Sequence, residues 1–160
     1  MKNTQPTLLN EKMNDFEKIC REQGVPLTVQ RRSILESLAL REDHPTADQV
    51  FEEVARHLPG LSRTTVYRVL ETLVKLGVIH KAAHLGSAAR FDANTHLHHH
   101  LTCLSCQKVV DVEDESIHGV ELTKTQSKGF EIQGYSVHFR GYCPECSAKL
   151  KLSRTKKGRD

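Results

Sequence analysis

Two Cys-x-x-Cys pairs, Cys103/Cys106 and Cys143/Cys146, constrain the fold of this chain more strongly than any other sequence feature. The pairs are separated by about 36 residues, and together they can supply the four thiolates of one tetrahedral zinc ion. Four thiolates leave no coordination position for a substrate, so we expect a structural zinc whose loss would cost folding. A redox dithiol and unrelated thiols are the alternatives, but a redox motif would not need a second matching pair.

A run of histidines precedes the first pair in the segment HLHHHLTCLSC, residues 96–106. Side chains alternate along a β-strand, so His96, His98 and His100 would share one face of it. Imidazole and thiolate are both common ligands of transition metals. These residues alone leave open whether the segment contributes to one metal site, two or none.

Length, charge and hydropathy set broad limits on the class of protein. The 160 residues suffice for one ordinary domain or two small ones. A formal net charge of +3 and a pI of about 8.6 suit a nucleic-acid partner without requiring one. No apolar run has the length of a signal peptide or of a membrane span, so we expect a cytoplasmic protein with no membrane partner. In that reducing compartment, paired cysteines are more often zinc ligands than partners in a disulfide bond.

Helical spacing and capping residues predict several helices in the first half of the chain. They cover approximately residues 9–23, 29–40, 46–57 and 62–77. Cys20 falls on the apolar side of the first helix and is expected in the core. The next segment, VIHKAAHLGSAARFD, predicts a hairpin around a Gly/Ser/Ala turn. Helices followed by a hairpin indicate a winged helix-turn-helix.

The fourth predicted helix, SRTTVYRVLETLVKLG, has one apolar and one polar face. Its apolar residues at three- and four-residue spacing are Val66, Val69, Leu70 and Leu73. Arginine, hydroxyl and tyrosine side chains meet phosphates and base edges when such a helix enters the major groove of DNA. The candidate DNA contacts are Arg63, Thr64, Thr65, Tyr67 and Arg68. A merely solvated face is the alternative for this helix taken alone.

The composition changes near residues 91–95, where we expect a hinge. Strand-like LHHHLTC, KVVDV and YSVHFRGYC, with a helix expected over about 115–128, predict a small α/β unit. The predicted organisation is therefore α+β. It comprises a winged-helix domain at 1–91, a metal-binding domain at 96–150 and a basic, disordered tail at 151–160.

Seven motifs, in this order, resemble those of the ferric uptake regulator superfamily of metal-dependent bacterial repressors. They are LTVQRRSIL, HPTADQV, SRTTVYRVLETL, RFD, HLHHHLTCLSC, KVVDV and YCPEC, and they span about three-quarters of the chain. The resemblance implies a homodimer that binds double-stranded operator DNA, with the second domain as the dimerisation domain. Within the superfamily, the chain is most similar to the peroxide-sensing repressors.

The resemblance also implies a regulatory site for Fe²⁺ or Mn²⁺. Carried over residue by residue, its ligands are His44, Asp92, His98, His100 and Asp111. Peroxide sensors have aspartate where Asp111 stands, whereas iron-responsive members tend to have glutamate. The implied mechanism is iron-catalysed oxidation of His44 or His98, which releases the DNA.

Other positions depart from the peroxide-sensor pattern or remain unassigned. A further site of iron-uptake regulators would fall on Leu97, His99, His118 and Tyr135, where Leu97 cannot ligate a metal. Arg68 resembles the residue that iron-uptake regulators have at this position, whereas some peroxide sensors have asparagine there. His96 is either a ligand, a surface residue or a residue that contacts a ligand. His57, His80, His84 and His138 are expected to be ordinary surface or locally hydrogen-bonded histidines.

Three functions compete at this point. The first is a dimeric metal-dependent repressor that responds to peroxide, with sensing of iron or manganese concentration as its near alternative. The second is a metallo-hydrolase, for which no general base stands out, since residues 113–115 are expected to form a solvated acidic turn. The third is a zinc-stabilised interaction module, which leaves the SRTTVYR helix unexplained.

Overall fold

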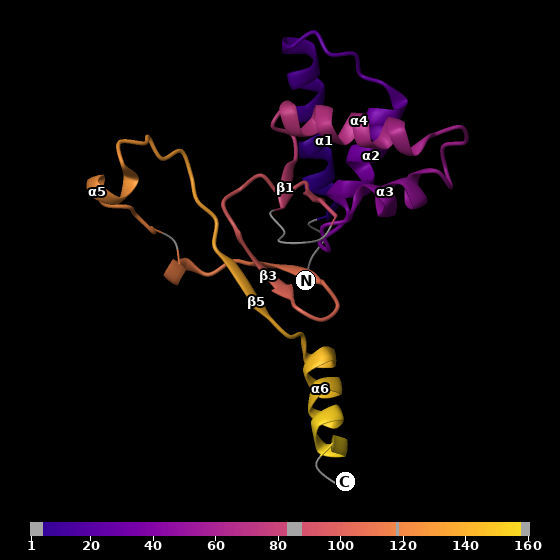
Figure 1. Cartoon of the computed structure of the whole chain (residues 1–160). Coiled ribbons are helices and arrows are strands. Elements are labelled where there is room, and N and C mark those ends of the chain that lie inside the picture. The colour runs from indigo at the N-terminus through magenta and orange to yellow at the C-terminus, as the bar shows by residue number, and fades with distance from the viewer. Residues whose placement is uncertain (1–4, 83–87, 118, 158–160) are drawn as a thin grey trace. The chain divides into compact units, whose positions relative to one another are not determined.

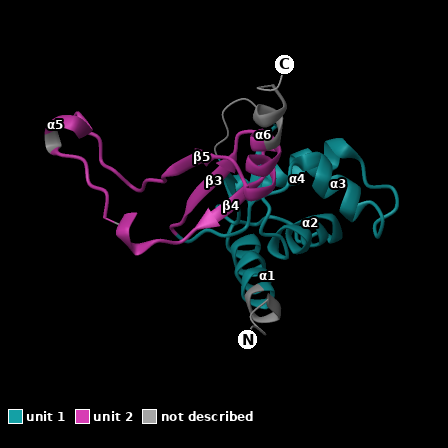
Figure 2. Cartoon of the chain, turned by 90° about the horizontal axis from the view of Figure 1, so that it is seen from below, with its two compact units in different colours: residues 1–96 teal, residues 97–160 magenta. Residues whose placement is uncertain are grey.

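The computed structural model describes residues 5–82, 88–117 and 119–157 of the chain (Figure 1). Two compact units divide the chain, Met1–His96 and Leu97–Asp160 (Figure 2). Their boundary falls next to the segment 91–95 where the composition changes. Within the described ranges, none of the helices combines the length and the apolar character that crossing a bilayer requires.

The first unit has four helices and one antiparallel two-stranded sheet among its described residues. The elements are α1 (Gln5–Glu22), α2 (Val29–Ala39), α3 (Ala47–Val54), α4 (Arg63–Lys75), β1 (His80–Ala82) and β2 (Arg90–Asp92). Thr28, Thr46 and Ser62 cap α2, α3 and α4, because each hydroxyl accepts a hydrogen bond from a backbone N–H three residues on. The predicted starts of these three helices are confirmed, whereas α1 begins at Gln5, before the predicted residue 9.

The core of this unit lies between the apolar faces of its helices. Phe16 of α1 and Leu35 of α2 are fully buried, and each such side chain contributes about 1.5–3 kcal/mol through burial. All four residues predicted on the apolar face of α4 are buried as well. Cys20 is core filler, as predicted, and desolvation raises the pKa of its thiol.

Strands β1 and β2 form the predicted hairpin. His80 pairs with Asp92 and Ala82 with Arg90 in an antiparallel register, while Gly86 and Ser87 of the predicted turn lie outside the described residues. The hairpin follows α4 directly, so the first unit has the winged helix-turn-helix order predicted from the sequence.

The second unit is built on a three-stranded sheet. Its strands are β3 (His99–Cys103), β4 (Val109–Val112) and β5 (His138–Gly141), in the order β4-β3-β5. Strand β3 runs antiparallel to β4 and parallel to β5. The helical elements of this unit are η1 (Glu115–Ile117), α5 (Lys124–Ser127) and α6 (Pro144–Lys157). The α+β class predicted from the sequence is confirmed.

Two details of this unit differ from the sequence prediction. The single helix expected over 115–128 is replaced by η1 and the short α5. Thr123 caps the start of α5, and Lys128, in a left-handed conformation, follows its end. Residues 151–157, expected in a disordered tail, belong to α6. Pro144 at the first position of α6 and the good helix formers Leu, Lys and Arg that follow favour this extension.

Candidate metal centres

The four paired cysteines gather at one end of the second unit. Cys103 ends β3, and the parallel register pairs it with Gly141, two residues before Cys143. Cys146 lies in the first turn of α6. The backbone N–H of Cys143 donates a hydrogen bond to the Cys103 sulfur at 3.4 Å. Strand pairing therefore unites two motifs that are distant in the sequence.

The geometry of this cysteine cluster fits a tetrahedral metal shell. One ligand atom from each cysteine lies within 4.8 Å of all the others, and the Cys106 and Cys143 sulfurs are 3.8 Å apart. Zinc–sulfur bonds of about 2.3 Å put tetrahedral sulfurs about 3.8 Å from one another. The distance is far above the length of a disulfide bond, and all four cysteines are free.

The thiols of this cluster differ in acidity. Hydrogen bonds from the backbone N–H groups of Cys106 and Cys143 lower the pKa of Cys103 to about 6. The Ser105 hydroxyl acts to lower the pKa of Cys146, but the neighbouring Cys143 thiol and burial act against it, and this pKa rises to about 11. One thiolate is thus available at neutral pH, while another proton must be displaced by a metal.

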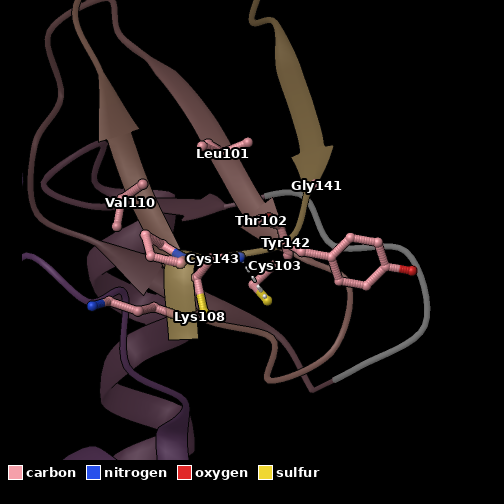
Figure 3. Close-up of a pocket in the computed structure, with 9 residues that line it drawn as sticks. Leu101, Thr102, Cys103, Lys108, Val110, Gly141, Tyr142 and Cys143 are labelled. Atoms are coloured by element: carbon pink, nitrogen blue, oxygen red, sulfur yellow. Dashed lines mark hydrogen bonds between the residues drawn. The ribbon is translucent and has the colours of Figure 1, made fainter. Parts of the chain in front are cut away.

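A cavity of about 220 Å³ adjoins the cysteine cluster (Figure 3). Its lining includes Leu101 of β3 and Val110 of β4. It also includes two residues of the cysteine cluster, Cys103 and Cys143, together with Tyr142. Leu101 also pairs with Phe139 of β5, and all three strand residues are exposed. This part of the sheet presents an apolar row, defined by Leu101, Val110 and Phe139.

Three further candidate ligands lie together, with His98 just before β3, His100 in β3 and Asp111 in β4. The Nε2 atoms of His98 and His100 are 3.0 Å apart, and Asp111 lies opposite His100 in the β3–β4 register. The Asp111 Oδ1 atom is 3.6 Å from His98 Nε2 and 3.9 Å from His100 Nε2. Neighbouring ligands of an octahedral ion with bonds of about 2.1 Å are about 3.0 Å apart. We refer to these three residues as the histidine triad.

The remaining two candidate ligands, His44 and Asp92, form a pair inside the first unit. His44 precedes α3, Asp92 ends β2, and the His44 Nε2 and Asp92 Oδ2 atoms are 3.3 Å apart. Both side chains are buried. Asp92 Oδ1 also accepts a hydrogen bond from the Asn94 backbone N–H at 2.7 Å. Each unit therefore collects its own share of the predicted regulatory ligands.

The other histidines have separate environments. His96 is exposed and precedes β3. His99 is fully buried, its Nδ1 accepts a hydrogen bond from the Val137 N–H, and its ring stacks on Tyr135 at 5.7 Å. His138 forms a 2.6 Å hydrogen bond with the Thr102 hydroxyl. His84, expected to be an ordinary histidine, and His118, expected at the further site of iron-uptake regulators, lie outside the described residues.

Helix α4 places its candidate DNA contacts at its N-terminal half. Thr64, Tyr67 and Arg68 are exposed, while the half-buried Thr65 shares a 2.8 Å hydrogen bond with the Ser62 hydroxyl. Arg63 forms a 2.9 Å ion pair with Asp48, and its guanidinium lies 4.4 Å from the centre of the Phe51 ring. Asp48 and Phe51 were not predicted as partners, because α3 and α4 meet only through the tertiary fold.

Comparisons with known proteins agree on one family. The sequence matches the model of the ferric uptake regulator family over residues 22–140. It is 32% identical to a peroxide-responsive repressor from Staphylococcus aureus over 129 residues, which are 81% of this chain and 87% of the relative.

Solved structures are similar in fold. The ferric uptake regulator of Helicobacter pylori gives a TM-score of 0.73 at 20% identity, covering 87% of this chain and 93% of that one. A zinc uptake regulator solved with zinc and DNA gives a TM-score of 0.64 at 24% identity, covering 94% and 99%.

The fold and the ligand groups together define a winged-helix protein that carries metal-ligand clusters. This chain belongs to the ferric uptake regulator family of metal-responsive repressors.

Proposed function

We propose that the protein is a homodimeric transcriptional repressor that binds operator DNA when its regulatory metal is bound. In this proposal the cysteine cluster holds structural Zn²⁺. The regulatory Fe²⁺ or Mn²⁺ takes its ligands from both units: His44, Asp92, His98, His100 and Asp111. The cytoplasm is the compartment that suits it, because the thiols must stay reduced to hold zinc.

The observation that carries the proposal is that each unit holds part of a metal-ligand set, and that only a short stretch of chain connects the two parts. The first unit supplies one imidazole and one carboxylate, and the histidine triad supplies two imidazoles and one carboxylate. Six residues lead from Asp92 to His98, so the two sets are tied within about 20 Å of each other even in a fully extended chain.

The chemistry of the combined set favours iron or manganese. Two carboxylates neutralise a divalent cation, and a mixed nitrogen and oxygen shell suits Fe²⁺ or Mn²⁺ better than metals that prefer thiolate. The thiolates of the cysteine cluster favour zinc instead. The two metals are therefore separated by ligand type.

A metal held by both units would favour one geometry of the chain over all others. Such a metal shifts the population toward the dimer shape that spaces two α4 helices for successive major grooves. The apolar row of Leu101, Val110 and Phe139 supports dimerisation through the second unit, since an exposed apolar patch on a sheet favours burial against a partner. Losing one ligand would reverse the shift.

Peroxide is the proposed signal. The short Asp111 side chain and the 32% identity to a peroxide-responsive repressor support this over simple metal sensing. The chemistry that bound ferrous iron would supply is catalysis of a two-electron oxidation, in which one oxygen atom of hydrogen peroxide is added to an imidazole and the other leaves as water. His44 and His98 are the proposed targets, and regulation by iron or manganese concentration alone is the second candidate.

The test begins with selection of tight-binding duplexes from a random-sequence pool with the Mn²⁺-loaded, zinc-replete protein. Binding of the selected duplex is then compared for the wild type, His44→Ala and the control His57→Ala, with and without a chelator. We expect the wild type and the control to require Mn²⁺ or Fe²⁺, and His44→Ala to bind about 100-fold more weakly even with metal. Metal-independent binding by the wild type would contradict the proposal.

The same proteins are then treated with peroxide, and the peptides containing His44 and His98 are analysed by mass spectrometry. We expect one added oxygen on a histidine and loss of duplex binding in the Fe²⁺ form, with neither change in the Mn²⁺ form. If the histidines stay unmodified and binding follows metal concentration alone, the protein senses metal and not peroxide.

A further inference from the structure

Arg90 contacts the backbone of the loop that carries His44, between α2 and α3. Its Nη1 atom donates a 2.9 Å hydrogen bond to the His44 carbonyl oxygen, across 46 residues of sequence. Arg90 belongs to the RFD motif, in which Asp92 is the proposed ligand, yet nothing in the proposed metal shell uses the arginine itself. The contact lies within the first unit and is partly buried.

The His44 backbone needs such support because its conformation is unfavourable. Its φ of 50° lies in the left-handed region, which is uncommon for residues other than glycine. The following residue is Pro45, and a residue before proline is further biased toward extended conformations. A backbone of this kind persists only where surrounding contacts impose it.

Strand β2 makes several of those contacts. The Phe91 N–H donates a 3.0 Å hydrogen bond to the Pro45 carbonyl, and Thr46 forms an isolated antiparallel bridge with Arg90. The strand that carries Asp92 therefore also holds the segment that carries His44. Arg90 adds the direct bond to His44 itself, and thereby ties the two proposed ligands to a common frame.

The start of the loop is fixed independently. Arg41 binds the Asp43 carboxylate through two hydrogen bonds of 2.8 and 2.6 Å, and its Nη1 atom binds Glu53 of α3 at 2.8 Å. These side-chain contacts hold the start of the loop, whereas the Arg90 hydrogen bond acts on the His44 carbonyl itself. Removing Arg90 should therefore loosen His44 without detaching the whole loop.

We infer that Arg90 is a positioning residue for the regulatory metal, because it holds His44 in the conformation that pairs its imidazole with Asp92. The inference rests on the proposed role of His44 and Asp92 as ligands. Loss of Arg90 should weaken metal binding about 10–100-fold, the range seen when residues that orient metal ligands are replaced.

The sign of this effect separates positioning from simple electrostatics. Arg90 is a cation near a proposed cation site, so Coulomb repulsion alone predicts tighter metal binding when the arginine is neutralised. Weaker binding is the opposite outcome and requires that the hydrogen bond to His44 matters. Lys81 of β1 offers a matched control, since it is a cation of the same hairpin and pairs with Glu71 at 2.6 Å.

The experiment measures Mn²⁺ affinity of the zinc-replete full chain by calorimetry for the wild type, Arg90→Gln, Arg90→Lys and Lys81→Gln. We expect Arg90→Gln to bind at least about tenfold more weakly, Arg90→Lys to fall between it and the wild type, and Lys81→Gln to stay within about twofold. Thermal unfolding with and without Mn²⁺ should show a smaller metal-induced rise in Tm for Arg90→Gln.

Equal Mn²⁺ affinity in Arg90→Gln and Lys81→Gln would overturn the inference. It would also be overturned if metal-free Arg90→Gln had a lower Tm than the wild type but Mn²⁺ raised the Tm of both proteins equally. If Arg90→Gln does not fold, Arg90→Lys decides the question by the same criteria. His44→Ala and Asp92→Ala are measured in parallel. Unchanged affinity in both would refute the proposed ligands, whereas weakened affinity there with unchanged Arg90 variants would refute only the role of Arg90.

Discussion

At the scale of single residues, Arg63 shows how an expected DNA contact is already engaged within the protein. Its guanidinium is held between the Asp48 carboxylate and the Phe51 ring. The side chains of Arg63 and Asp48 are each just over half exposed, at 54% and 55%, so water screens the ion pair and its contribution to stability is small, about 0–1 kcal/mol. Its larger effect should be on DNA, because Asp48 competes with phosphate for the same cation.

Replacing Asp48 should therefore change DNA binding more than folding. We expect Asp48→Asn to bind random-sequence duplexes about three- to tenfold more tightly at low salt, with a gain that shrinks as salt rises. Fluorescence anisotropy at several salt concentrations measures this. Glu52→Gln, an equal charge change at an exposed site on the same helix, is the control. Weaker binding by Asp48→Asn would show that the ion pair prepares Arg63 for DNA instead of competing with it.

At the scale of elements, the cysteine cluster joins the end of β3 to the start of α6. The four thiols are brought together by parallel pairing of β3 with β5, and their unequal acidity follows from local hydrogen bonds. Cys103, with a pKa of about 6, is largely ionised at neutral pH, whereas Cys146, with a pKa of about 11, is protonated. Zinc binding must therefore release protons, and its affinity must rise with pH.

This gives a prediction for zinc affinity. At pH 7–8 the Cys146 proton must be displaced, and below about pH 6 the Cys103 proton must be displaced as well. We expect a plot of log affinity against pH to become steeper below about pH 6, as measured by competition with a chromophoric chelator. Cys20→Ser should behave like the wild type, because Cys20 is buried in the other unit. An affinity that does not change with pH would contradict the thiol protonation described above.

Sequence patterns predict those elements whose determinants are local. The caps at Thr28, Thr46 and Ser62 and the buried face of α4 follow from short-range periodicity, and the structure confirms them. The segment 115–128 does not form the single predicted helix. Its helical conformation is interrupted, because Gly119 and Lys128 both have a positive φ. The extension of α6 over residues 151–157 differs from the prediction because their helix propensity outweighs their basic composition.

The grouping of the candidate ligands is more predictable from the sequence than the contacts that support them. The cysteine spacing pointed to a shared cluster, and the family motifs pointed to the histidines and aspartates that each unit gathers. The bond from Arg90 to the His44 carbonyl and the contacts of Arg63 with α3 join residues that no spacing rule connects. Such contacts join residues that are far apart in the sequence and meet only when the chain folds, so no local sequence pattern predicts them.

At the scale of the whole molecule, the proposed regulation depends on one metal joining the two units. His44 and Asp92 come from the winged-helix unit, and the histidine triad comes from the α/β unit. A shared metal would convert metal occupancy into a fixed arrangement of the α4 helices, which is what metal-dependent DNA binding requires. Two independent metals, one in each unit, would give no such coupling.

The most direct test is the Mn²⁺ binding stoichiometry of the zinc-replete wild type, Asp92→Ala and Asp111→Ala, measured by calorimetry. If the two units share one metal, the wild type binds one Mn²⁺ per chain at the regulatory ligands, and either substitution weakens that single event by about 100-fold or more. If the wild type binds two Mn²⁺ ions per chain and each variant retains one of them, the units bind metal separately and the proposed clamp is wrong.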